Sequence, residues 1–237
     1  SGGALSLESG EGTATSSGVI AVRSANAGAS GVSGRLVFSS GSADGGNSGS
    51  LHLGSGVSAG GRGGLLSISV GSGASGSGGA VSVLSGRSTV HSGGALSLES
   101  GEGTATSSGV ISIRTANAGA SGASGRLIFS SGSASGGNRG ALYVALGVTT
   151  GGRGGMVSIS VGSGTSGTGG AVSVLSGRST VHSGGALRLA SGEGTATSSG
   201  VISIRTANAG TSGVSGRLAF SSGSASGGNS GALYVGS

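Results

Sequence analysis

Apolar residues recur along the whole chain in short alternating stretches. Each stretch has two apolar positions separated by a single residue, and the stretches follow one another at an almost constant interval. The first six pairs are Leu5 and Leu7, Ile20 and Val22, Leu36 and Phe38, Leu51 and Leu53, Leu66 and Ile68, and Val81 and Val83. A period of two is typical of a β-strand that buries one face. The pattern therefore predicts one short strand in every unit, with Gly, Ser and Ala in between.

A longer repeat contains this short one. The motif Ser-Gly-Gly-Ala-Leu begins at Ser1, Ser92 and Ser183, so six units make a repeat of 91 residues, and the first two copies agree at 73 of 91 positions. Self-similarity at a fixed period is typical of solenoids and arrays. We interpret the chain as one continuous array with repeat 1 at 1–91, repeat 2 at 92–182 and a partial repeat 3 at 183–237. A copy that stops partway indicates a segment of a longer array.

The fold class follows from how such short strands could be covered. One short strand per unit cannot bury its apolar face alone, whereas strands stacked about 4.8 Å apart cover one another. The sequence predicts an all-β fold, a β-solenoid or β-helix of about fifteen 15-residue units with one unit in each coil. A flattened solenoid with two units in each coil is an alternative, and stacked hairpins or a sandwich also remain open.

Glycines punctuate the units at fixed places. One precedes each alternating stretch by two positions; in repeat 1 these are Gly18, Gly34, Gly49, Gly64 and Gly79. Glycine tolerates both a positive φ and a close approach of neighbouring chain, which the corners of a coil require. The unit between Ile20 and Leu36 is one residue longer than the others, and we expect the extra residue as a bulge or an enlarged corner at 29–35.

Opposite charges recur at a separation of one unit. A Glu and an Arg stand at the same position of neighbouring units, so stacked units would place them on adjacent rungs, where opposite charges attract. The predicted register pairs are Glu8 with Arg23, Glu99 with Arg114, Arg87 with Glu102, and Arg178 with Glu193. An exposed pair contributes only about 0–1 kcal/mol, so its expected value is in fixing register. In the third copy Ala190 replaces the Glu, and Arg205 lacks that partner.

Composition limits the classes of protein to consider. Gly supplies 60 of 237 residues, and Pro and Cys are absent, which excludes collagen and disulfide frameworks. Such a composition alone is typical of disorder, but hydrophobic residues still reach 34% and are regularly spaced.

The net charge is +6, and all twelve basic residues are Arg, spread singly along the chain. No apolar run approaches the roughly 18 residues of a membrane span. We therefore expect no nucleic-acid partner and no membrane span, while O-linked glycans on Ser and Thr are compatible with the sequence.

Residues with catalytic or metal-binding chemistry are few and scattered. The three histidines are His52, His91 and His182, and without Cys they form no recognisable zinc set. Glu8 and Glu11 are close in sequence, but nothing else in the pattern builds a pocket around them. An ice-binding helix would need Thr-x-Thr on every coil, whereas Thr13-Ala14-Thr15 occurs once per repeat. We expect no catalytic, cofactor or metal site and no enzymatic activity.

The unit sequences resemble a known class of proteins. Segments such as GGALSLESG at 2–10, SGRLVFSSG at 33–41, GGAVSVLSG at 78–86 and SGVISIRTA at 108–116 are similar to Gly/Ser-rich tandem repeats in large surface proteins predicted in microalgae. The resemblance implies β-solenoid fibres, cell-wall components or flagellar hairs.

Repeat and resemblance together predict the function. We expect a structural subunit or segment of an extracellular fibre or surface appendage. Its partners would be further repeats of the same chain or copies stacked head to tail. A repetitive adhesin or surface-binding module, including an ice-binding one, is the alternative. In either case we expect the chain outside the cell or at its surface.

Overall fold

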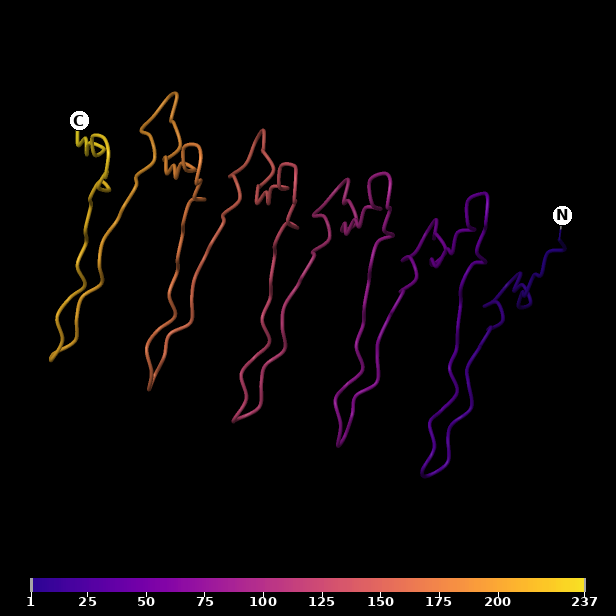
Figure 1. Cartoon of the computed structure of the whole chain (residues 1–237). Coiled ribbons are helices and arrows are strands. Elements are labelled where there is room, and N and C mark those ends of the chain that lie inside the picture. The colour runs from indigo at the N-terminus through magenta and orange to yellow at the C-terminus, as the bar shows by residue number, and fades with distance from the viewer. Residues whose placement is uncertain (1, 237) are drawn as a thin grey trace. The chain divides into compact units, whose positions relative to one another are not determined.

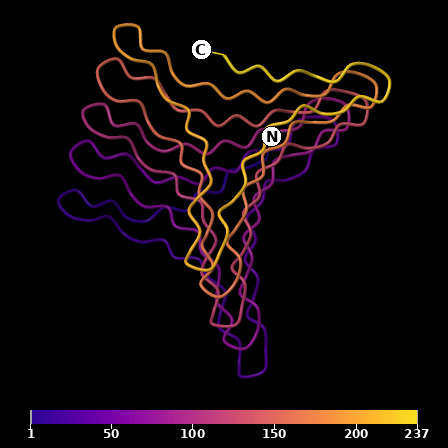
Figure 2. The same cartoon turned by 90° about the vertical axis from the view of Figure 1, so that its left-hand side faces the viewer.

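The chain changes direction at regular intervals. The structure, a computed structural model, describes residues 2–236 and has no helix and no β-strand among them. Its turns and bends fall midway between the alternating apolar stretches; in repeat 1 they lie at 13–15, 29–30, 44–46, 59–61, 74–76 and 89–91, and equivalent bends follow in later repeats. Figure 1 shows the resulting course, in which the chain runs outward, turns and comes back, and the rotated view shows the same (Figure 2). The short period predicted from the apolar stretches is therefore present as a period of chain reversal.

The predicted β-solenoid is wrong for this structure. A strand exists only where a neighbouring segment supplies a ladder of N–H and C=O partners, and no such ladder forms between residues 2 and 236. Ten backbone–backbone hydrogen bonds join these residues, against roughly one hydrogen bond per residue in folded globular proteins. Seven of the ten link a glycine to another eight positions earlier, and three lie inside a tight turn. The alternating stretches at Leu5, Ile20 and Leu36 are thus extended segments without partners.

The first reversal of each repeat is closed at its base by a pair of glycines. The amide of Gly18 donates to the carbonyl oxygen of Gly10 at 2.9 Å, and the hydroxyl of Ser9 donates to the carbonyl oxygen of Gly18 at 3.1 Å. The Gly10–Gly18 bond recurs in both later copies, at Gly101–Gly109 and Gly192–Gly200. The repeated sequence therefore determines where the chain folds back. The one or two hydrogen bonds at the base of a reversal are too few to form a β-sheet.

The glycine before an apolar stretch stands where two chain segments approach closely. A Cβ added to Gly18 would lie 3.1 Å from the Cβ of Ser9, and one added to Gly34 would lie 3.0 Å from the Cβ of Ser24. These separations are shorter than ordinary van der Waals contact, so only glycine fits without displacement. The sequence suggested two reasons for glycine at these positions, a close approach of neighbouring chain and a positive φ. The structure shows the close approach, whereas no residue of the described chain has a positive φ.

The chain divides into two compact units. The first is Ser1–Arg114 and the second is Thr115–Ser237. The boundary falls inside the second 91-residue repeat, shortly after Ile113, and does not coincide with the repeat limits at 91/92 and 182/183. Both units contain the same kind of reversal, closed by the same pairs of glycines.

Neither unit has a buried core. Every residue from 2 to 236 is exposed or half-exposed, and no apolar side chain among them is buried. The accessible surface is 23146 Å² for a chain of 21.3 kDa. A folded globular monomer of that mass exposes about 9,100 Å², and the fully unfolded chain about 31,000 Å². The single chain therefore retains about three quarters of the surface that an unfolded chain would expose.

Candidate functional site

The alternating apolar stretches leave regularly spaced apolar side chains exposed along the described chain. In some stretches neighbouring side chains differ in exposure: Ile20 is 48% exposed and Val19 is 88% exposed. The same contrast separates Leu66 at 53% from Leu65 at 89%. In these two stretches the period of two in the sequence corresponds to a difference in exposure between two sides of the segment, whereas Val37 and Phe38 are exposed almost equally, at 60% and 62%. The more protected side is the one suited to a partner that would complete its burial.

A shallow hollow lies on the same four residues in two of the repeats. Arg23, Ser24, Ala25 and Asn26 line a cavity of about 300 Å³. Residues 205–208, with the sequence Arg-Thr-Ala-Asn, line a cavity of about 240 Å³ at the equivalent position two repeats later. The lining offers a guanidinium group, a hydroxyl and a carboxamide, all of which can donate hydrogen bonds.

In the first repeat the second unit closes its reversal just beyond this hollow. The hydroxyl of Ser24 donates to the carbonyl oxygen of Gly34 at 2.8 Å, and the amide of Gly31 donates to the carbonyl oxygen of Gly28 at 3.3 Å. The Ser–Gly pair spans ten positions here, whereas Ser9–Gly18 and Ser55–Gly64 span nine. The extra residue of the longer unit therefore lies between Ser24 and Gly34.

Two of the predicted register residues have partners close in sequence. The carboxylate of Glu8 accepts a hydrogen bond from the hydroxyl of Ser6 at 2.9 Å, and Glu99 accepts one from Ser97 at 3.2 Å. Both contacts are local and do not involve the neighbouring unit. The pairing of Glu8 with Arg23 and of Glu99 with Arg114 therefore stays a prediction.

The other two predicted glutamates lie inside reversals rather than on a rung of a sheet. Glu102 directly follows Gly101, the glycine that closes one reversal with Gly109, and its side chain is exposed. Glu193 has the equivalent place beside Gly192 in the third repeat and is exposed as well. Since the solenoid rungs expected to juxtapose Arg87 with Glu102, and Arg178 with Glu193, do not form in the described chain, these two pairings also stay predictions.

Arg23 and Arg205 have an environment that sequence reasoning missed, because each of them lines one of the two hollows. Arg114 occupies the equivalent sequence position of the second repeat. The signal that could have found it was the sequence Arg-Ser/Thr-Ala-Asn, which stands at the same place in all three repeats.

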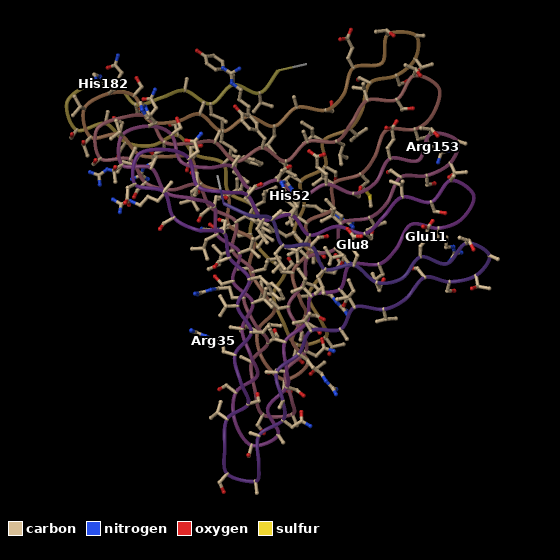
Figure 3. All side chains as sticks on the ribbon, turned by 90° about the vertical axis from the view of Figure 1, so that its right-hand side faces the viewer. Glu8, Glu11, Arg35, His52, Arg153 and His182 are labelled. Atoms are coloured by element: carbon tan, nitrogen blue, oxygen red, sulfur yellow. The ribbon has the colours of Figure 1, made fainter. Side chains whose placement is uncertain are left out.

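Titratable side chains stand apart from one another along the described chain. Figure 3 shows the side chains of Glu8, Glu11, Arg35 and His52 projecting separately from the ribbon. No three His, Cys, Asp or Glu residues between positions 2 and 236 come close enough to hold a metal ion. His91 and His182 instead take part in turns: their backbone amides donate to the hydroxyl oxygens of Ser88 and Ser179, each at 2.9 Å.

Comparison with known proteins adds no relative. No protein family, no curated protein and no solved structure matches the chain. Among residues 2–236 there is also no helix long and apolar enough to cross a membrane.

Proposed function

We propose that this chain is a structural subunit or segment of an extracellular fibre or surface appendage, assembled by association of its tandem repeats with further copies of the same sequence. The observation that carries the proposal is the exposure of regularly spaced apolar side chains in every repeat. Burial of apolar surface contributes about 25 cal/mol per Å². Side chains such as Ile20, Leu36 and Leu51, each near half exposure, therefore provide a strong drive to associate.

Copies of the same chain are the best matched partner for this surface. The apolar positions recur every 91 residues with no insertion or deletion, so a neighbouring copy displaced by one repeat offers the same positions at the same intervals. A repeating contact of this kind adds favourable energy with each repeat and does not close on itself. Extended segments with unpaired backbone N–H and C=O groups reinforce the tendency, because they offer hydrogen-bonding groups to a neighbouring chain.

A role in architecture rather than catalysis fits the same features. The hydrophobic surface is spread evenly along the chain, whereas an enzyme needs a few polar groups converging on one enclosed pocket. The composition favours a place outside the cell, because the Gly/Ser-rich repeats resemble those of surface proteins. The proposal includes no cofactor and no nucleic-acid partner.

Assembly can be tested directly on the purified chain. Sedimentation velocity over a range of concentrations should show growth from the 21.3 kDa monomer into larger species, and electron microscopy should show filaments at high concentration. Binding of a dye specific for exposed apolar surface should fall as filaments form, because the apolar stretches become covered. A species that stays monodisperse and monomeric at millimolar concentration would refute the proposal.

A further inference from the structure

Asp44 and Gly45 stand at an open bend of the chain. The bend covers 44–46, and the side chain of Asp44 is exposed. A Cβ added to Gly45 or to Gly46 would meet no atom within 4 Å, so both positions border open space. Among residues 2–236 neither the Asp44 carboxylate nor the Gly45 amide has a hydrogen-bond partner. Nothing in the described chain therefore holds these two adjacent groups apart.

The step from Asp44 to Gly45 is the one place in the sequence where Asp or Asn precedes a glycine. The six Asn residues are followed by Ala, Ser or Arg, and Glu precedes a glycine three times. A five-membered ring closes when an Asp carboxyl group reaches the next amide nitrogen, whereas Glu would have to close a six-membered ring, which forms more slowly. Glycine has no Cβ to shield its nitrogen, and it leaves the backbone free to rotate into the conformation that ring closure needs.

We propose that the open bend makes Asp44 a site of spontaneous backbone modification, at which aspartate is converted to isoaspartate. The Gly45 amide nitrogen attacks Cγ of the protonated Asp44 carboxyl group. A C–N bond forms, and the carboxyl OH leaves with the amide proton as water. Water then adds to the resulting succinimide ring. Cleavage between the nitrogen and the Asp44 backbone carbonyl carbon leaves Gly45 joined through Cγ, which is isoaspartate, and cleavage of the other ring C–N bond restores aspartate. One water is lost and one regained, so no oxidant, reductant or further reactant is needed.

The product changes the backbone at one reversal of the chain. In isoaspartate the main chain passes through Cβ and Cγ and so gains one carbon atom, while the former backbone carbonyl group becomes the free carboxylate and the charge is unchanged. A reversal can contain this extra length, because the one between Ser24 and Gly34 already contains a whole additional residue. The equivalent positions of the later repeats are Ser135 and Ser226, which have no carboxyl group. The modification is therefore specific to the first repeat.

The test moves the Asp-Gly step along the full-length chain without changing its composition or net charge. In one variant Asp44→Ser is combined with Ser135→Asp, which places the step in the equivalent open bend of the second repeat. In the other, Asp44→Ser is combined with Ser17→Asp. The attacking nitrogen would then be that of Gly18, whose amide donates to the carbonyl oxygen of Gly10 at 2.9 Å. The two variants thus compare an Asp-Gly step in an open bend with one at the closed base of a reversal.

The three chains are incubated below the concentration at which they associate. Isoaspartate is measured over time by labelling with an isoaspartyl methyltransferase and is located by peptide mapping. Wild type should accumulate isoaspartate at residue 44, and the Ser135→Asp variant should accumulate it at residue 135 at the same rate. The Ser17→Asp variant should react about two- to tenfold more slowly, because the Gly18 amide must first leave its hydrogen bond.

An aged wild-type chain without isoaspartate at residue 44 would overturn the proposal. Equal rates at residues 17 and 44 would overturn it as well, since the open bend would then have no part in the reaction. The chains stay unassembled throughout, so either failure leaves the assembly proposal standing.

Discussion

The hydroxyl of Ser24 donates a hydrogen bond of 2.8 Å to the carbonyl oxygen of Gly34, ten positions further along the chain. In two other units of the same repeat the equivalent Ser reaches a Gly only nine positions away. This reversal thus contains one more residue than the other two, while the same hydrogen bond from a Ser hydroxyl to a Gly carbonyl oxygen closes its base. The Ser–Gly pair, rather than the length of the loop, defines where the chain folds back in these units.

Close approach at the base predicts a steric requirement for glycine. In Gly18→Val, the new side chain would begin 3.1 Å from the Cβ of Ser9 and push the two segments apart. The bond from the Gly18 amide to Gly10 would then be weakened or lost, at a cost of about 0.5–1.5 kcal/mol. We expect hydrogen exchange at residue 18 to rise about two- to tenfold, as measured by NMR or mass spectrometry.

Gly41→Val is the matched control for this substitution. A Cβ at Gly41 meets nothing within 4 Å, so the same change of side chain should leave exchange at residue 18 unaltered. Neither glycine has a positive φ, so backbone strain does not distinguish them. An equal effect at the two positions would show that glycine is needed for flexibility and not for space.

A second prediction concerns the turn acceptor at residue 58. The hydroxyl oxygen of Ser58 accepts a hydrogen bond from the amide of Gly61 at 2.9 Å, and Thr149 does the same for Gly152 at 3.1 Å in the next repeat. Ser58→Ala should therefore expose the Gly61 amide and speed its exchange about two- to tenfold. Ser58→Thr should retain wild-type exchange because the second repeat already uses that residue. Faster exchange in both variants would contradict the assigned role of the hydroxyl.

The sequence predicted the spacing of structural units well and their secondary structure wrongly. Positions of reversal follow from Gly and Ser at fixed intervals, because bends and close approaches are local properties of such residues. Strands are not local: Ile20 and Val22 have the right alternation, but a strand also needs a neighbour at hydrogen-bonding distance. Alternation shows that one side of a segment is suited to burial, and it does not identify what covers that side.

For the charged residues too, the sequence indicates some features of the environment and not others. Sequence reasoning singles out Arg23 for its distance of one unit from Glu8, a pairing that depends on how units stack. The hollow with Ser24 and Asn26 depends on how the chain curves locally, which the spacing of charges does not reveal.

A third prediction tests whether Glu8 and Arg23 interact. In a double-mutant cycle with Glu8→Gln and Arg23→Gln, a register pair should give a coupling free energy of up to about 1 kcal/mol in the assembled state, measured from critical concentrations. The coupling should shrink in high salt. Arg205 provides the natural comparison, because Ala190 stands in place of its Glu and leaves no such pair to break. A coupling free energy of zero at low salt would show that Glu8 and Arg23 do not interact.

The last prediction concerns the apolar surface that drives assembly. Leu36 and Leu127 occupy the same position in consecutive repeats, and each is 48% exposed in the single chain. Full burial of a Leu side chain contributes about 1.5–3 kcal/mol, so covering the exposed half in a filament should contribute about 1 kcal/mol at each site. The double substitution Leu36→Ser and Leu127→Ser should then raise the critical concentration for assembly about ten- to thirtyfold, as measured by pelleting. Val57→Ser with Val148→Ser is the control, since these two valines are exposed to 104% and 101% and lie outside the alternating pairs. If the two double variants assemble at the same concentration, apolar content in general drives association and the alternating face has no special part in it. If the Leu variant alone is impaired, the period of two in the sequence marks the side of each segment that a neighbouring copy covers.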